Sequence, residues 1–515
     1  MSNSTPQSIQ IADTVETRIG TLSFRDGAPS PETAAKVHDH LDFSRGVDAF
    51  LNSFRGASVN AIRKGFLEIG VEDNDVLMFS ELMDSQSLFL TGNSDTVYFI
   101  SFVDVSDAPM VIDVPRLSAP STILGTIDDM WFNWVTDFGA PGPDRGNGGK
   151  YLIVGPDYEG TLPDGGFHLF HARTTRVCVL GRAFMIDNDP SGPAAEIKDS
   201  LRIYPYKEGT EGTAISAFLA GRSPLSEAPE VQPTRFVEGS RKALNTIPSN
   251  DFSYWEAIDE LIQREPAGAG DPEILGQLAA VGIVKGKPFA PDERMRSILE
   301  EAVVLGDATA RTIAYSPREE SGFSYYEGSS WFNPLFVGGY EFLDSPPQIT
   351  PQGVVAAVSD GARKLDSRIS FLYLATGITP AMCMRLTGVG SQYLLGVRSS
   401  DGEYLDGSKS YKLSLPAGIP YERFWSVTVY DRQTRSMLQT DQPMPRLGSQ
   451  SGTVAENEDG SIDIYFSPEP QPGTEGNWLQ TIPGRGWFPI LRFYSPKAAF
   501  FDKSWRPSEI EAIPG

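Results

Sequence analysis

The sequence predicts an α+β protein, mainly β, built from two antiparallel β-sandwich or jelly-roll-like domains with helical insertions. Three observations support this prediction. Short runs of β-branched and aromatic residues occur in two separate parts of the chain, and breaks rich in glycine and proline separate them. The breaks leave little room for the helices that a parallel sheet needs between its strands. The 50 glycines and 39 prolines among 515 residues exceed average usage of about 12%, which favours a turn-rich β architecture.

The first 75 residues are expected to form an N-terminal helical segment. An apolar stripe that includes Val37, Leu41 and Phe54 predicts a helix that begins at Ser30-Pro31-Glu32, where proline suits the first helical turn. A second helix is expected over residues 57–69, ending at Gly70. We therefore expect two consecutive helices before the first β domain.

Residues 76–206 are expected to form the first β domain. Its predicted strands are 96–103, 110–114, 151–154, 167–172 and 177–185. The segments 139–143 and 162–166, both rich in glycine and proline, are expected to be turns between them.

Residues 207–375 are expected to form a connector and a helical region. The connector carries Pro224, Pro229, Pro233 and Pro248, and helices are predicted at 254–264, 290–313 and 353–374. Residues 376–515 are expected to form the second β domain, with strands at 391–397, 410–415, 424–430, 461–466 and 488–493.

The charge and the termini weigh against several partners. Lysine and arginine number 43 and aspartate and glutamate 67, a net charge of −24 that repels phosphate backbones, so no nucleic acid partner is expected. No window approaches the roughly 20 apolar residues of a membrane span. The N-terminus lacks the basic and apolar regions of a signal peptide, so we expect a cytoplasmic protein without a membrane partner. No feature fixes the oligomeric state.

Few side chains are available for familiar catalytic motifs. Cys178 and Cys383 are far apart and are expected to be buried, reduced thiols. The chain has four histidines, and none belongs to a zinc-binding motif. No GxSxG elbow or Walker loop occurs, and Gly388-Val389-Gly390 lacks the third glycine of a dinucleotide fingerprint. No nucleotide cofactor is therefore expected.

Several segments resemble a known family. Gly92-Asn93-Ser94-Asp95-Thr96-Val97-Tyr98, 148–156 and Gly181-Arg182 are similar to one domain, and 424–431 and 491–494 to another. These are the paired domains of unknown function twelve-fifty-four (N-terminal) and twelve-fourteen (C-terminal). The resemblance implies two β-sandwich-like domains with helical insertions, and many members are exported in bacteria. The chain departs from the pattern at His171-Ala172-Arg173-Thr174, where an Arg-Ser-Pro-Thr stretch is expected.

The resembling segments contain the candidate site residues. In the first domain, Asp95, Tyr98 and Arg182 are the candidate catalytic residues and Asn93 and Thr96 candidate ligand-binding residues. Asp95 would act as a general base or an oxygen ligand, with Tyr98 and Arg182 binding an anionic or hydroxylated ligand. The metal is undetermined, although carboxylate and amide oxygens suit Ca²⁺ or Mg²⁺ better than zinc. The structural alternative is a turn, with Arg182 paired to Asp95.

The second domain adds aromatic and polar candidates. The candidate ligand-binding residues there are Trp425, Tyr430, Asn477, Trp478 and Arg492. Aromatic residues that alternate along strands are most often core, but they also line ligand clefts.

Two functions of different classes remain open. The first is an enzyme of the hydrolase or lyase type that acts on a small organic molecule in a cleft between the two β domains, and a buried carboxylate with a raised pKa beside Tyr98 or Arg182 would favour it. The second is a non-catalytic ligand-binding or structural β-sandwich protein. A filled interface and a fully paired Asp95 would favour the second.

Overall fold

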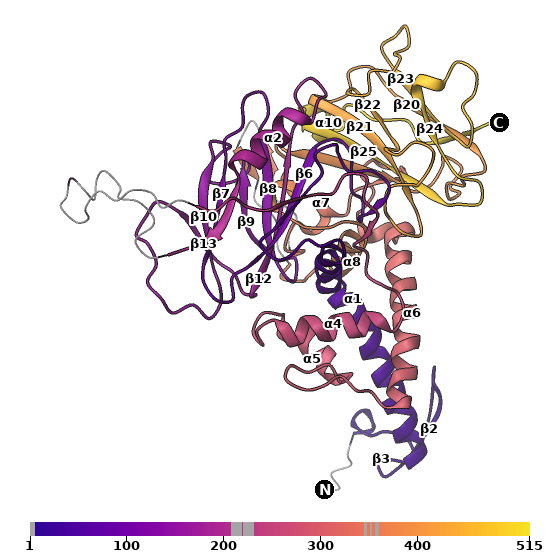
Figure 1. Ribbon diagram of the computed structural model, residues 1–515. Helices are drawn as coiled ribbons and strands as arrows, with labels where there is room; N and C mark the ends of the chain where they lie inside the picture. The colour runs from indigo at the N-terminus through magenta and orange to yellow at the C-terminus, as the bar shows by residue number, and fades with distance from the viewer. Residues whose placement is uncertain are drawn as a thin grey trace.

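The computed structural model describes residues 6–207, 219, 231–343, 348–350, 353–355 and 360–514. It confirms the α+β, mainly β fold class. Figure 1 shows two β-rich regions side by side, with a helical layer that extends away from them. The jelly-roll connectivity, the finer part of the expectation, stays a prediction.

The first β region packs two sheets face to face. A six-stranded sheet in the order β14-β4-β6-β12-β8-β9 faces a four-stranded sheet in the order β11-β10-β7-β13. Its strands are β4 (Val76–Met78), β6 (Val97–Asp104), β7 (Met110–Val114), β8 (Ile123–Asp129), β9 (Trp134–Gly139), β10 (Gly149–Val154), β11 (His168–His171), β12 (Arg176–Ala183), β13 (Arg202–Pro205) and β14 (Phe236–Glu238). Helix α2 (Ser191–Ser200) also packs on this core.

The second β region repeats the arrangement. A five-stranded sheet, β16-β19-β25-β21-β22, faces a four-stranded sheet, β24-β23-β20-β26. The strands are β16 (Trp331–Phe332), β19 (Ser391–Gly396), β20 (Ser410–Leu415), β21 (Tyr421–Asp431), β22 (Arg446–Gly448), β23 (Ile462–Ser467), β24 (Trp478–Gln480), β25 (Trp487–Pro496) and β26 (Glu511–Ile513).

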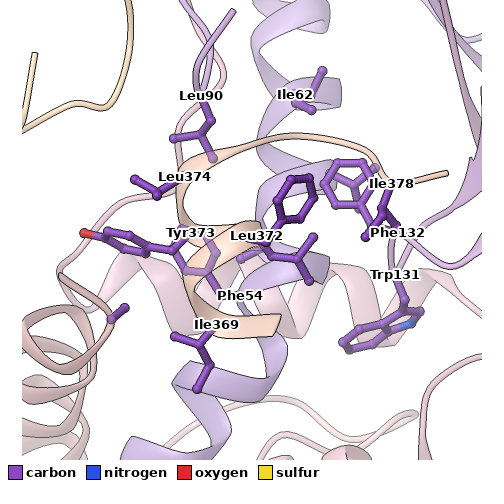
Figure 2. Packing of buried hydrophobic residues seen from close by; sticks show 14 of the residues in the cluster. Phe54, Ile62, Leu90, Trp131, Phe132, Ile369, Leu372, Tyr373, Leu374 and Ile378 are labelled. Carbon is purple, nitrogen blue, oxygen red and sulfur yellow. The ribbon is translucent and has the colours of Figure 1, made fainter. Parts of the chain in front are cut away.

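The helices form a third layer against the two large sheets. Its main members are α1 (Pro31–Glu68), α4 (Ser253–Arg264), α5 (Pro272–Ala280), α6 (Glu293–Tyr315) and α8 (Leu365–Leu374), joined by the short α7 (Leu335–Gly338) and α9 (Pro380–Cys383). The short helix α10 (Ala498–Phe501) packs on the core of the second β region instead. Helices α1 and α6 run in the same direction, because Arg294 at the start of α6 pairs with Asp39 and Asp42 early in α1. Figure 2 shows where α8 packs on α1, with Phe54, Leu372 and Trp131 in the shared core.

The structure also contains several short strands and turns. The hairpin β1 (Thr14–Thr17), β2 (Gly20–Arg25) and β3 (Ala28–Pro29) lies beside the start of α1, and β5 (Ser87–Leu88) pairs with β15 (Leu244–Asn245). The strands β17 (Gln348–Thr350) and β18 (Gly353–Val355) pair with each other, and short 3₁₀ turns lie at Gln7–Ile9, Glu319–Ser321 and Glu475–Asn477. Within the described residues, no helix is long and apolar enough to cross a membrane.

Two helix predictions are wrong, each for a physical reason. The expected break near residue 56 is absent, and α1 is one 38-residue helix. Gly56 serves close packing instead: a Cβ there would lie 2.8 Å from Leu261 and 2.9 Å from Trp131. The helix expected over 353–374 begins only at Leu365, since 353–355 form β18, and residues 356–359 lie outside the described ranges.

The large sheets are buried on both faces, and this positions the site. Along β6, Val97 and Phe99 point into the first sandwich, whereas Ile100 and Phe102 point toward the helical layer. Strand β25 is arranged in the same way: Leu491 points into the second sandwich, and the residues before and after Leu491 point to the opposite face. Strands buried on both faces lack polar alternation. The outer faces of the two large sheets meet, and the site lies between them.

Candidate functional site

A cavity of about 380 Å³ lies between the two β regions. Strands β6, β8 and β12 of the first large sheet and β19 and β25 of the second contribute to its wall, and α8 and α9 close it from the helical layer. Its apolar wall includes Ile100, Leu180, Leu374, Leu395 and Ile490. Ligand sites of this size are commonly apolar with a few placed polar groups.

Among the described residues, three arginines line the cavity: Arg182 and Arg492, which come from opposite sheets, and the exposed Arg423. Arg182 on β12 donates through Nη2 to Ser391 Oγ on β19 at 2.8 Å. Arg492 on β25, 2% exposed, donates through Nη2 to Tyr430 Oη at 2.5 Å and to the carbonyl of Thr91 at 3.1 Å. The structure thus brings together a candidate from each half of the chain.

Tyrosines surround both guanidinium groups. Tyr393 Oη is 2.7 Å from Ser391 Oγ, the hydroxyl that Arg182 contacts, and its ring centre is 5.8 Å from Arg492 Cζ. Arg182 Cζ lies 5.5 Å from the centre of the Tyr494 ring. Burial alone would lower the pKa of Arg182, but the oxygens of Tyr393, Tyr98 and Tyr494 raise it above its ordinary value. Tyr430, Tyr494 and Asp95 likewise raise the pKa of Arg492 above its ordinary value against the effect of burial, so both arginines stay charged.

Asp95 is a buried link between the two β regions and does not line this cavity. Its Oδ2 accepts from Ser426 Oγ at 2.7 Å and from Tyr494 Oη at 3.0 Å, and Oδ1 is 3.6 Å from Arg446 Nη1. The pair with Arg182, considered from the sequence, is not formed. Among the described residues, the side chains that contact the Asp95 carboxylate all come from the second β region, so the geometry favours a structural tie. Its catalytic role stays a prediction.

The other first-domain candidates differ in whether they line the cavity. Asn93 and Tyr98 line the cavity, and Asn93 Nδ2 donates to Tyr98 Oη at 2.9 Å. Asn93 Oδ1 also accepts from the backbone N–H of Asp95 at 3.0 Å, the Asx contact expected of a turn. Thr96 is fully buried, and its hydroxyl has no hydrogen-bond partner among the described residues.

The second-domain candidates do not form one group. Tyr430 donates to the Gly92 carbonyl at 2.7 Å, and burial raises the pKa of Tyr430 to about 12. Trp425, 1% exposed, lies in the second sandwich. Asn477 bonds the backbone of Ala455 and the carbonyl of Asp463, and the Trp478 indole donates to the Ser467 carbonyl, both at the far sheet. Their ligand roles stay predictions.

The structure adds residues that sequence reasoning missed. Ser391 and Tyr393 were counted only as strand residues, although their period of two puts both on the face toward the cavity. A buried carboxyl pair, Asp128 and Asp137, lies behind the cavity wall, where Asp137 accepts from the Thr379 hydroxyl. For Asp128 the available signal was the pair of consecutive acids Asp128-Asp129 in the mostly apolar segment 123–132, and nothing local marked Asp137. Among the described residues, no group of three acids, histidines or cysteines could hold a metal ion.

Asp128 supplies a pH-dependent prediction. Burial raises the pKa of Asp128 well above its ordinary value, although the N–H of Ile378 donates to Oδ2 at 2.9 Å and lowers it in part. A carboxyl group whose pKa is higher in the folded than in the unfolded protein stabilises the fold fully at pH values below its unfolded-state pKa, about 3.9. This stabilisation is lost as the pH rises through the folded-state pKa. Asp128→Asn keeps an oxygen for Ile378 and removes this dependence. We expect the Tm of the variant minus that of wild type to be larger at pH 8 than at pH 4.

Thermal unfolding of both proteins at the two pH values measures this difference. The exposed Asp107→Asn is the control and should shift Tm equally at both. A difference for Asp128→Asn that is the same at pH 4 and pH 8 would show that Asp128 is ionised in the folded protein.

Fold and site together define a class: a β-rich α+β protein in which two domains enclose a mostly apolar cavity with arginines in its wall. Residues 74–205 match the family described as Protein of unknown function (DUF1254), and residues 390–498 match Protein of unknown function (DUF1214). The chain belongs to the family that pairs these two domains.

One solved structure shows the same fold at low identity. The chain is similar to the VPA0106 protein from Vibrio parahaemolyticus, with 18% identity, a TM-score of 0.50, and coverage of 92% of this chain and 100% of that one. It is also similar to an uncharacterized protein from Burkholderia cenocepacia, with 15% identity, a TM-score of 0.40, and coverage of 93% and 96%. No curated protein matches the chain.

Proposed function

We propose that the protein binds a small organic molecule in the cavity between its two β domains. The observation that carries this proposal is the cavity itself, about 380 Å³ at a domain interface, with an apolar wall and convergent polar groups. Cavities of this kind are the usual sites of small-molecule binding. An interface whose only role was to join two domains would be expected to pack to interior density.

Filling the cavity tests the proposal. Ala381 on α9 lines it and is partly buried, so Ala381→Trp places an indole in the ligand space. We expect binding of hexanoate, octanoate and decanoate, measured by calorimetry, to weaken at least tenfold, or about 1.4 kcal/mol. The control is Ala279→Trp, at an exposed position on α5. Equal affinities in wild type and Ala381→Trp would contradict binding in this cavity.

A hydrolase or lyase reaction is the second candidate function. The observation that favours it is that Tyr98 and Arg182, two of the three candidate catalytic residues, line the cavity. A positioned phenol can transfer a proton to a bound substrate. Mass spectrometry of a metabolite mixture incubated with the protein should then show compounds that wild type consumes and Tyr98→Phe does not. Consumption that persists in Tyr98→Phe would remove Tyr98 from the mechanism.

The remaining expectations concern partners and location. The net charge of −24 supports our proposal that the chain has no nucleic acid partner. A cytoplasmic location is likewise a proposal, and fractionation of the source cells tests it.

A further inference from the structure

Arg182 and Arg492 have no carboxylate in direct contact, although Asp95 acts from a greater distance to raise the pKa of Arg492. Arg446, which faces Asp95 at 3.6 Å, has a carboxylate partner. Within the described residues, neither Arg182 nor Arg492 has a carboxylate within 4.0 Å. Of these three guanidinium groups, Arg446 alone is within 4.0 Å of a carboxylate of the described residues, so Arg182 and Arg492 carry charges that no contacting carboxylate balances. Burying an uncompensated charge costs several kcal/mol.

Arg492 also has unused donors. Its Nη2 serves Tyr430 and Thr91, but Nε and Nη1 are buried without a hydrogen-bond partner among the described residues. The side chain is 2% exposed and forms part of the cavity wall. A buried donor without an acceptor costs about 1–3 kcal/mol, and more when it is charged. These atoms would gain an acceptor from an anion in the cavity.

The two guanidinium groups share a neighbour, because Arg182 and Arg492 both act to lower the pKa of Tyr494. A chain of contacts also joins them: Arg182 donates to Ser391, Ser391 bonds Tyr393, and the Tyr393 ring centre is 5.8 Å from Arg492 Cζ. Tyr430 and Tyr494 supply no negative charge, because burial raises the pKa of Tyr430 to about 12 and that of Tyr494 above its ordinary value. The cationic end of the cavity is therefore open to a ligand anion.

We propose that the ligand is a small organic acid with an apolar body, whose carboxylate lies between Arg182 and Arg492 and whose body contacts Ile100, Leu180, Leu374 and Leu395. This inference rests on the proposed ligand-binding function and specifies its chemistry. Guanidinium groups pair with carboxylates through two parallel N–H donors. The apolar wall excludes inorganic phosphate or sulfate as the preferred ligand, because neither fills it.

The test compares matched ligands on wild-type protein. Calorimetry measures octanoate against octanamide, its neutral counterpart, and against inorganic phosphate. Charge-assisted hydrogen bonds predict that octanoate binds about 10- to 100-fold more tightly than octanamide. Arg182→Met and Arg492→Met should each remove most of that preference, and Arg492→Lys should keep part of it. Arg296→Met, on the exposed face of α6, is the charge control and should leave it unchanged.

The outcomes separate this inference from the proposed function. If octanoate and octanamide bind equally and Ala381→Trp weakens both, the inference that the ligand is an organic acid is wrong. The proposal that the cavity binds a small molecule would then still hold. If phosphate binds as tightly as octanoate, the inference that the ligand has an apolar body is wrong. Failure of every ligand to bind wild type would overturn both proposals. The comparison on wild type does not depend on whether an arginine variant folds.

Discussion

Asp95→Ala is expected to lower the free energy of unfolding by about 3–5 kcal/mol, the usual cost of removing one partner of a buried ion pair. The substitution leaves Arg446 without its carboxylate, and it leaves the hydroxyls of Ser426 and Tyr494 without their acceptor. These groups all lie in the second β region, so the loss also loosens its contact with β6. Urea unfolding followed by tryptophan fluorescence measures the effect.

Two comparisons make this prediction specific. Asp107→Ala, at an exposed loop position, should change the free energy of unfolding by no more than about 0.5 kcal/mol. Asp95→Asn keeps an acceptor of the same shape but removes the charge, so it should cost less than alanine. A loss below about 1 kcal/mol for Asp95→Ala would mean that the carboxylate does not hold the domains together.

The same substitution separates the two roles of Asp95. If Asp95 is a general base, Asp95→Asn should abolish turnover of any compound that wild type consumes while the protein stays folded. If it is a structural tie, turnover and octanoate affinity should persist in the folded variant. The geometry favours the second result, because the carboxylate does not line the cavity and its contacts are with Ser426, Tyr494 and Arg446.

Strands with a local apolar pattern were easier to predict than strands whose polar residues bond distant segments. β7 and β20 begin and end at the residues predicted, because β-branched and aromatic runs between turns define them locally. Strands β8 and β9 were missed, since Thr126, Asp128 and Asp137 break the apolar pattern. Those polar side chains bond each other and residues of the segment before α9, which is about 240 residues away in the sequence.

The site was predictable only in part, for a similar reason. Arg182 and Arg492 were both selected as candidates, yet no local pattern shows that they line one cavity. Their juxtaposition depends on how two large sheets meet, and that contact is set by tertiary packing. The aromatic candidates could not be told apart from the sequence, because Tyr430 and Trp425 belong to the same strand pattern. In the structure Tyr430 contacts Arg492, whereas Trp425 lies in the second sandwich.

Trp425→Ala is the second substitution with a large expected effect. Trp425 is 1% exposed and points into the second sandwich, while the next residue on β21, Ser426, points to Asp95. Truncating a buried tryptophan removes its burial free energy and leaves a cavity, at a cost of about 3–5 kcal/mol. Trp478→Ala should cost less, about 1 kcal/mol, because Trp478 is partly buried and mainly loses one hydrogen bond to Ser467.

Ligand affinity then decides whether Trp425 belongs to the core or to the site. Trp425→Phe retains an aromatic ring and most of the packing, so enough folded protein should remain for calorimetry with octanoate. A core residue predicts a lower Tm with octanoate affinity unchanged, since the side chain faces away from Arg492 and the cavity. A ligand-binding residue predicts the reverse, weaker octanoate binding at nearly constant Tm. Because neighbouring residues on β21 point to opposite faces, the first result is expected.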